Sequence, residues 1–353
     1  MMKTYTHGGD ILTARAAHGG EVVDFSANLN PLGMPPAVRE AAMGAVRDAV
    51  HYPDPLCRAL TAGIAERDGV EPGWVLCGNG AADLIFRLCF SERPRRALVT
   101  APTFTEYQDG VQAGGGETVF HRLTADSDFT LTETVLEDLT EDLDMAFFCT
   151  PNNPTGRPVD RELMERIVAR CGERGIRLVV DECFMALSDG GEAGSLAWLV
   201  QTNPHLLLLR AFTKSYAIPG LRLGYCITSD GALLDRLTRC AQPWSVSAPA
   251  QAAGLAALRV PEHPRLARKL IGGERSWLTE RLGELGLRVF PSAANYLLFL
   301  APGIADLKEK LLKQGVLIRS CANYEGLGGD YYRVAVRLRA ENQALVEALG
   351  EVL

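Results

Sequence analysis

Short apolar runs alternate with segments of helical period through the middle of the chain. In the segment 161–174, Leu163, Ile167 and Val168 fall on one stripe with charged positions opposite. This alternation predicts an α/β fold with a mostly parallel sheet and helices on both of its faces. The predicted strands are 74–77, 97–100, 145–149, 177–180, 206–209 and 223–228, and the predicted helices between them are 81–90, 161–174 and 231–240.

The pattern changes after about Gln251, and this change predicts a second, smaller α+β domain. We expect a long helix through Leu266, Leu270, Trp277 and Leu282. The strands 288–290, 295–300, 316–318 and 331–336 then follow, with a helix at 304–314 and a closing helix from Ala340. A chain of 353 residues is long for one core. We therefore expect an N-terminal segment (1–44) packed beside the small domain, a large domain (45–250) and a small domain (251–353).

Composition and charge narrow the class of protein. With 47% hydrophobic and 22% charged residues the chain has the composition of a soluble globular protein. A formal charge of −7 argues against nucleic acid as a partner. No apolar run is long enough for a signal peptide or a membrane span. The nine cysteines form no Cys-x-x-Cys pair, so we expect a cytoplasmic protein, and the six histidines show no ligand spacing, so we expect no metal.

Lys214 and Arg222 are the first candidates for chemistry. The lysine lies in an apolar, turn-rich segment, where poor solvation lowers the pKa of an amine and makes it a nucleophile. Arg222 follows a Pro-Gly turn that can fold it back toward the amine, where its charge suits an anchored phosphate. An amine with a phosphate anchor is what pyridoxal phosphate requires. The alternative is a surface lysine and arginine flanking an ordinary turn.

Further candidates follow predicted strands, where open α/β sheets place their ligand sites. The Gly78-Asn79-Gly80 turn leads into a helix whose first amides, at Ala81 and Ala82, could hold a phosphate, although a plain glycine turn is the simpler interpretation. Asn153 lies in a proline-stiffened Asn-Pro-Thr-Gly loop and could donate a hydrogen bond to a ring oxygen. Asp181 directly follows a buried strand, and a protonated pyridine nitrogen would be a suitable partner; an N-cap or a local ion pair is the alternative.

Three more side chains are weaker candidates. Phe104 follows another strand and could stack on a planar ring, but core packing is equally plausible. Arg319 ends one predicted strand and Arg333 begins another. Their guanidinium groups suit carboxylates and phosphates, although single arginines at strand ends are usually solvated.

Taken together, these motifs resemble those of the fold-type I pyridoxal-phosphate enzymes of the aspartate-aminotransferase class. Gly-Asn-Gly, Asn-Pro-Thr-Gly, Asp181, Lys214 and Arg222 occur in the family order, and the resemblance covers nearly the whole chain. Within that family the chain resembles the histidinol-phosphate aminotransferase branch, and most closely the threonine-phosphate decarboxylases of cobalamin biosynthesis. The decarboxylase likeness rests on the segments 7–10, 24–33, 181–184, 213–222 and 333–337.

The resemblance implies a role for each of these residues. Lys214 would be the Schiff-base lysine, Asp181 the partner of the pyridine nitrogen, and Asn153 a ligand of the ring oxygen and of the substrate. Phe104 would stack on the ring, and Tyr52 would reach the phosphate from a partner subunit, which implies a homodimer with shared active sites. Ala81, Ala82, Thr213 and Arg222 would hold the cofactor phosphate, and His7, Gly8, Asn28, Arg319 and Arg333 would bind a small phosphorylated amino-acid substrate.

Two positions depart from the aminotransferase pattern. Aminotransferases of this branch usually carry tyrosine where this chain has Phe184, so the hydroxyl that would bond the ring oxygen is missing; the decarboxylases share this change. Ala211 stands where serine or threonine commonly contacts the phosphate. We expect one hydrogen bond fewer there, worth roughly 1.5–3 kcal/mol at most.

The sequence leaves two reactions open. The resemblance favours decarboxylation of O-phospho-L-threonine to aminopropanol phosphate, and the alternative is transamination of histidinol phosphate or a related amino acid. The protein selects between them by how it holds the substrate. Arg319, Arg333 and Arg337 are available for this, but the sequence does not fix which binds phosphate and which carboxylate. A regulatory protein that has kept the fold and a dinucleotide-binding dehydrogenase are poorer fits, because a basic segment and the third glycine of Gly-x-Gly-x-x-Gly are missing.

Overall fold

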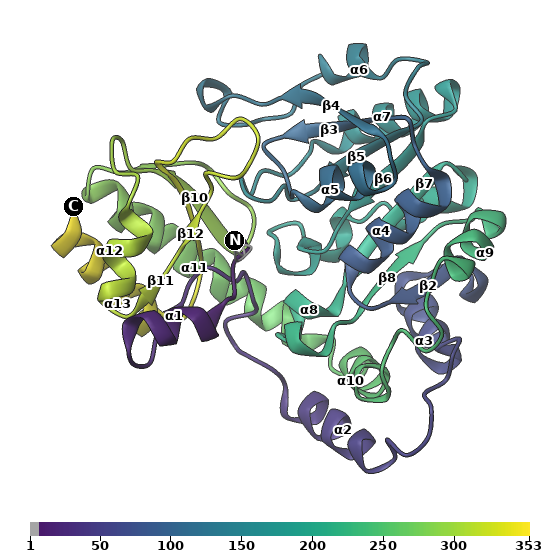
Figure 1. The fold of residues 1–353 in the computed structure, drawn as a ribbon, viewed down its shortest axis with the longest axis horizontal. Coiled ribbons are helices and arrows are strands. Elements are labelled where there is room, and N and C mark those ends of the chain that lie inside the picture. The colour runs from purple at the N-terminus through teal and green to yellow at the C-terminus, as the bar shows by residue number, and fades with distance from the viewer. Residues whose placement is uncertain (1–6) are drawn as a thin grey trace.

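A seven-stranded sheet forms the centre of the larger part of the molecule in this computed structural model, which describes residues 7–353 (Figure 1). The strand order is β2-β8-β7-β6-β5-β3-β4. Only β8 runs antiparallel to its neighbours β2 and β7; the other pairs are parallel. The strands are β2 (Val75–Gly78), β3 (Arg96–Ala101), β4 (Glu117–Arg122), β5 (Met145–Cys149), β6 (Arg177–Asp181), β7 (Leu206–Ala211) and β8 (Gly224–Ile227).

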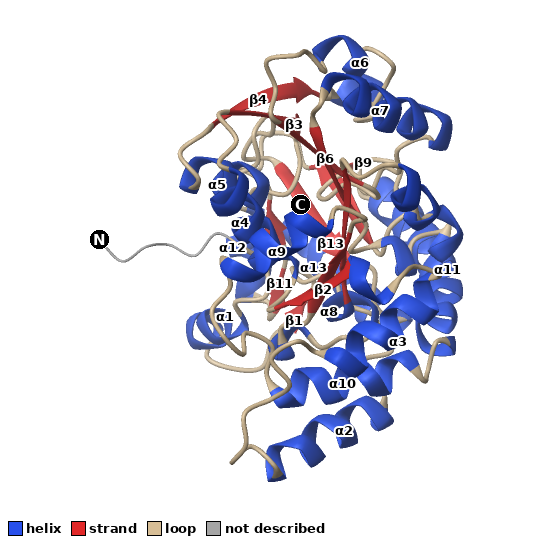
Figure 2. Ribbon diagram, turned by 90° about the vertical axis from the view of Figure 1, so that its right-hand side faces the viewer, coloured by secondary structure: helices blue, strands red, loops and turns tan. Residues whose placement is uncertain are grey.

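Helices cover both faces of this sheet (Figures 1 and 2). Strand β7 shows why: Leu206 and Leu208 enter one hydrophobic core, while Leu207 and Leu209 enter the other. A strand that is buried on both faces reads as a continuous apolar run, which is the pattern of the sequence. The helices of this part are α2 (Pro36–Arg47), α3 (Arg58–Asp68), α4 (Ala81–Glu92), α5 (Glu106–Ala113), α6 (Val135–Asp138), α7 (Arg161–Arg174), α8 (Phe212–Ser215), α9 (Gly231–Arg239) and α10 (Ala248–Leu258).

A separate antiparallel sheet of order β12-β13-β10-β9 lies in the C-terminal part. Its core includes Leu278 and Leu282 of the long helix α11, packed with Phe299 and Tyr332 of the sheet. The elements are α11 (Glu262–Glu284), β9 (Arg288–Val289), β10 (Tyr296–Leu300), α12 (Leu307–Lys313), β11 (Val316–Leu317), β12 (Arg319–Ser320), β13 (Tyr331–Ala335) and α13 (Arg339–Val352).

The beginning of the described chain adds to this smaller part. Strand β1 (Val23–Asp24) pairs in parallel with β11, and helix α1 (Ile11–His18) lies beside it (Figure 1). Helix α2 packs instead against α10 of the large part. The chain between α1 and α2 therefore passes from the smaller part of the molecule to the larger part.

The predicted fold class is confirmed, with two differences in detail. Strand β4 was not predicted, because Glu117, His121 and Arg122 interrupt its apolar positions, as they can at the edge of a sheet. The short strands β1 and β12 were also not expected. Among residues 7–353, no helix is both long and apolar enough to cross a membrane.

The topology brings the candidate residues to one edge of the large sheet. Strands β3, β5, β6 and β7 are parallel, so their carboxyl ends meet there. Phe104 and Asn153 lie in the loops after β3 and β5, Asp181 is the last residue of β6, and Lys214 lies in helix α8 directly after β7. The small sheet supplies Arg319 and Arg333.

Candidate active site

A phosphate-sized anion would be held where helix α4 begins. Gly80 precedes the helix with a φ of +88°, and a Cβ built there would collide with the guanidinium of Arg222. A Cβ on Gly224 would lie 2.5 Å from the amide nitrogen of Ala81. The two glycines thus let Arg222 and the first turn of the helix approach each other. The helix amides and a guanidinium fork together provide the donors that phosphate requires.

Lys214 lies in the short helix α8, next to the buried Thr213. Although the residue keeps part of its surface open, protein atoms surround its amine. Burial, followed by the positive charge of Arg333, lowers the pKa of Lys214 to about 8. The amine nitrogen lies 5.8 Å from the centre of the Phe184 ring. Near neutral pH, a much larger share of this amine than of an ordinary lysine is therefore neutral and nucleophilic.

Asp181 ends strand β6 and is buried. The hydroxyl of Tyr107 donates to its Oδ2 at 2.7 Å, and the backbone amide of Cys183 donates to its Oδ1 at 2.8 Å. Both donors are neutral groups. A buried carboxylate held by neutral donors is suited to a cationic partner such as a protonated pyridine nitrogen. Burial, and then the Asp181 charge, raise the pKa of Tyr107 well above its usual value, so its hydroxyl keeps the donated proton.

Asn153 joins the large sheet to the small one. Its side-chain oxygen accepts a hydrogen bond from Arg333, whose other terminal nitrogen donates to the carbonyl of Ser26 at 2.8 Å. The hydroxyl of Tyr324 lies 3.5 Å from the same Asn153 oxygen. Since its oxygen is engaged in this way, Asn153 presents its amide N–H₂ to whatever occupies the site.

The two candidate arginines are neighbours across the small sheet. Arg319 and Arg333 face each other in the register of β12 and β13, and both are buried. Arg319 donates to Asn323 at 2.6 Å and lies over the Tyr324 ring at 5.3 Å. The Nε of Arg333 is buried without a partner among the described residues. A buried pair of guanidinium groups of this kind is suited to an anion.

Arg337 does not belong with them. Its Nε donates to Glu341 at 2.9 Å and its Nη1 to the carbonyl of Asp24 at 3.0 Å. Its charge is thereby matched by a carboxylate. This arginine ties helix α13 to the N-terminal segment.

The N-terminal candidates come from the segment before β1 and the loop after it. The Nε2 of His7 lies 3.0 Å from a carboxylate oxygen of Glu106 in α5, and a Cβ on Gly8 would collide with the carbonyl of Ser26. Asn28 is buried, and neither its amide nitrogen nor its oxygen has a hydrogen-bond partner in the described part of the chain. Unpartnered buried amides are costly, so Asn28 is suited to a ligand.

The remaining candidates differ in their positions. Phe104 lies edge-on to Tyr107, with ring centres 5.6 Å apart. The ring of Phe184 packs edge-on against Tyr296 at 5.0 Å, and its lack of a hydroxyl leaves no donor there. Tyr52 lies on the surface, 78% exposed, and stacks on Trp244 at 4.2 Å. Ala211 pairs with Gly224 across β7 and β8.

The sequence analysis missed three tyrosines of the site: Tyr107, Tyr296 and Tyr324. Tyr296 donates to the carbonyl of Asn152 at 3.0 Å and lies 5.6 Å from the Arg333 guanidinium. A signal did exist for Tyr107, because it lies in the first turn of helix α5, three residues after Phe104. Tyr296 and Tyr324 come from the small domain, so no local motif connects them to Asn153.

These residues fit pyridoxal phosphate. Gly80, with no side chain, leaves room for Arg222 at the α4 terminus to hold the phosphate. Asp181 offers a carboxylate for the ring nitrogen, Asn153 an amide for the ring oxygen, and Lys214 an amine for the aldehyde carbon. Residues 7–353 contain no cluster of His, Cys, Asp and Glu side chains that could hold a metal ion.

The fold and this set of residues define a pyridoxal-phosphate enzyme of fold type I. The family model for aminotransferase class I and II matches residues 20–349, so the chain belongs to that family. The family resemblance and the predicted cofactor are confirmed, and with them the prediction that the protein is an enzyme.

Some of the similar proteins are named as decarboxylases and others as aminotransferases. The threonine-phosphate decarboxylase of Salmonella typhimurium is 41% identical over 98% of this chain and 96% of its own. The solved L-threonine-O-3-phosphate decarboxylase of Porphyromonas gingivalis is 25% identical, with a TM-score of 0.81 over 93% of this chain and 98% of its own. The histidinol-phosphate aminotransferase of Clostridium acetobutylicum is 27% identical, with a TM-score of 0.86 over the same shares.

Proposed function

We propose that this enzyme decarboxylates O-phospho-L-threonine to aminopropanol phosphate and carbon dioxide, a step of cobalamin biosynthesis. The similarity to the Salmonella typhimurium decarboxylase supports this substrate. The single structural observation that carries the proposal is the Arg319–Arg333 pair. Two buried guanidinium groups on adjacent strands suit a substrate with two anionic groups, here a carboxylate and a phosphate.

We further propose how the two arginines divide this work. Arg333 contacts Asn153, which we place at the ring oxygen, so Arg333 is the arginine nearer the reacting carbon and would hold the carboxylate. Arg319 would take the phosphate, and the unpartnered amide of Asn28, with His7 and Gly8, would complete the substrate site. This arrangement would fix the orientation of the bond between Cα and the carboxylate, which is the bond that is cleaved.

The other residues supply the chemistry around that bond. Pyridoxal phosphate, when bound, accepts the electron pair that the departing carbon dioxide leaves on Cα. Asp181 would keep the ring nitrogen protonated. Lys214 would deliver the proton that replaces the carboxylate on Cα, which is consistent with its lowered pKa. Ala81, Ala82, Thr213 and Arg222 would hold the cofactor phosphate, with Phe104 against the ring.

Transamination of histidinol phosphate is the second candidate. The TM-score of 0.86 to a solved histidinol-phosphate aminotransferase favours it, as does the shared need for a phosphate site. Phe184 argues against it. The ring lies where the aminotransferases usually have tyrosine, and phenylalanine provides no hydroxyl for the ring oxygen.

We also propose a homodimer with shared active sites. Tyr52 projects from the surface against Trp244, and Met43, Val46, Val50 and Leu56 of the same region are exposed apolar side chains. A second copy would cover them and bring Tyr52 to the partner's cofactor phosphate. We propose a large domain that runs from α2 to α10, rather than over 45–250 as expected, because α2 and α10 pack against each other, and a small domain from α11 to residue 353. A cytoplasmic location is supported by the nine cysteines, all of which are free thiols.

One assay with two substrate sets separates the reactions. With O-phospho-L-threonine alone, the holoenzyme should release carbon dioxide and form no glutamate. With histidinol phosphate and 2-oxoglutarate, it should form little glutamate. Glutamate from the second set, with no carbon dioxide from the first, would overturn the decarboxylase proposal in favour of the aminotransferase.

A further inference from the structure

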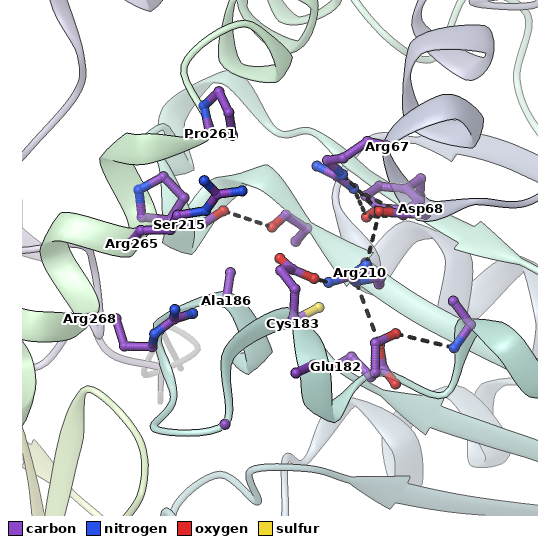
Figure 3. A pocket seen from close by; sticks show the side chains of 18 of the residues that line it. Arg67, Asp68, Glu182, Cys183, Ala186, Arg210, Ser215, Pro261, Arg265 and Arg268 are labelled. Carbon is purple, nitrogen blue, oxygen red and sulfur yellow. Dashed lines mark hydrogen bonds and ion pairs between the residues drawn. The ribbon is translucent and has the colours of Figure 1, made fainter.

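A cavity of about 480 Å³ adjoins the active site described above, since Cys183 and Ala211 are among its lining residues (Figure 3). It opens between the first turns of α11 on one side and the ends of α3, β6 and β7 on the other. Lys214, Asp181, Asn153, Arg222 and Arg333 are not among its lining residues. Its volume lies within the range of small-molecule sites in proteins.

In the large-domain wall, both arginines are already paired with carboxylates. Arg210 pairs with Asp68 at 3.2 Å and lies 3.6 Å from Glu182, and it also contacts Glu192. Arg67 pairs with Asp68 at 2.7 Å. Dashed lines in Figure 3 mark this network. Neither arginine of this wall is therefore free to pair with an anionic ligand.

The α11 wall differs, because its two arginines, Arg265 and Arg268, form no ion pair with a carboxylate of the described residues. Further along the same helix, Arg275 pairs with Asp189 and Arg281 with Glu284. In the described part of the chain, no carboxylate lies within ion-pair distance of Arg265 or Arg268. The two stand three residues apart, on one side of the first two turns of the helix, and both line the cavity.

Arg268 is also held in place. A Cβ on Gly191 would collide with its guanidinium, so this group lies directly on the backbone of the turn Gly191–Gly194. The φ of Gly191 is +53°, a conformation that favours glycine. The turn thus leaves room for Arg268 at the edge of the cavity.

The rest of the lining is largely apolar and aromatic. Tyr216, Trp198, Pro261, Pro264 and Ala186 contribute to it. An inorganic ion would leave this surface in contact with water. A ligand with an apolar body would cover it, while its anionic group would reach the arginines.

We propose that this cavity binds a small organic anion, a phosphate or carboxylate on an apolar body, through Arg265 and Arg268. The site is separate from the catalytic one and independent of which reaction the enzyme performs. Two guanidinium forks close together suit the bidentate recognition of such a group.

Titration calorimetry on the holoenzyme tests the proposal, with phenyl phosphate, benzoate and inorganic phosphate as probes. Wild-type protein should bind phenyl phosphate at two sites per chain, one of which is the active site and is lost in Arg319→Gln. The double variant Arg265→Gln/Arg268→Gln should weaken the other site at least about tenfold. Comparing phenyl phosphate with benzoate identifies the anionic group, and inorganic phosphate should bind this site more weakly than phenyl phosphate.

Lys269→Gln is the matched control, since it removes an exposed charge from the same helix outside the cavity lining. It should bind the probes as wild type does. Melting temperatures of all variants check that the fold is retained. The proposal would be overturned if the double variant bound both organic probes as tightly as wild type and the control do. It would also be overturned if wild type bound neither organic probe outside the active site.

Discussion

The hydroxyl of Tyr107 donates a 2.7 Å hydrogen bond to Asp181, the carboxylate that we place against the ring nitrogen of the cofactor. Tyr107 itself is fully buried and stacks on Phe147 with ring centres 5.1 Å apart. Packing therefore fixes the direction of the donor. A buried carboxylate with a fixed donor keeps its position.

Tyr107→Phe should lower kcat on the order of tenfold to a hundredfold, because a hydrogen bond to a buried charge contributes roughly 1.5–3 kcal/mol. The pH dependence of the holoenzyme's absorption spectrum should also change, whereas replacing a purely structural tyrosine would leave it unchanged. Tyr332→Phe is the control, since that hydroxyl donates to Ile304 in the small domain at 2.9 Å. Equal effects of the two variants on kcat and on the spectrum would contradict the role of Tyr107.

The lowered pKa of Lys214 gives a pH prediction for the apoenzyme. Covalent uptake of pyridoxal phosphate, trapped with borohydride, should speed up as pH rises through about 8 and then level off, because the neutral amine reacts. Lys214→Ala should take up no trapped label. A rate that keeps rising to the ordinary lysine value of 10.5, or a label on another lysine, would contradict this.

The same shift has a consequence for stability. The unfolded chain holds the Lys214 proton up to about pH 10.5, whereas the folded apoenzyme releases it near pH 8. The unfolded state binds more protons in between, so the free energy of unfolding should rise with pH across that window. Lys214→Met should flatten this part of the curve measured by urea denaturation.

Arg333→Lys should damage substrate use much more than cofactor binding. Lysine keeps the charge but cannot contact both Asn153 and the Ser26 carbonyl while it holds a carboxylate. We expect kcat/KM to fall about tenfold to a hundredfold, with the dissociation constant for pyridoxal phosphate nearly unchanged. Arg337→Lys, at an arginine paired with Glu341, should leave kcat/KM close to wild type.

Tyr52→Phe should weaken cofactor retention by roughly 0.5–3 kcal/mol if its hydroxyl reaches the partner's cofactor phosphate. Equilibrium dialysis of the variant measures this, and analytical ultracentrifugation should show a dimer for both proteins, because the ring is retained. A monomer that stays fully active at all dilutions would rule out shared active sites.

The parts of the site that the sequence revealed are those that a single strand and its following loop determine. Asp181 was found because an apolar run ends directly before it, and Lys214 because it lies in an apolar, turn-rich segment. The tyrosines of the small domain were not, because Tyr324 meets Asn153, and Tyr296 meets Asn152, only after two domains pack. Arg337 shows the opposite limit: the same residue type as Arg333, four positions on, is used for an ion pair with Glu341.

The most direct test of the central claim is to measure which carbon takes up deuterium from the solvent. The holoenzyme is incubated with O-phospho-L-threonine in deuterium oxide, and the mixture is followed by phosphorus NMR and mass spectrometry. The decarboxylase account predicts aminopropanol phosphate with one carbon-bound deuterium at the former Cα, and unreacted substrate that keeps its Cα proton. Substrate that exchanges its Cα proton for deuterium while no aminopropanol phosphate forms would contradict the account.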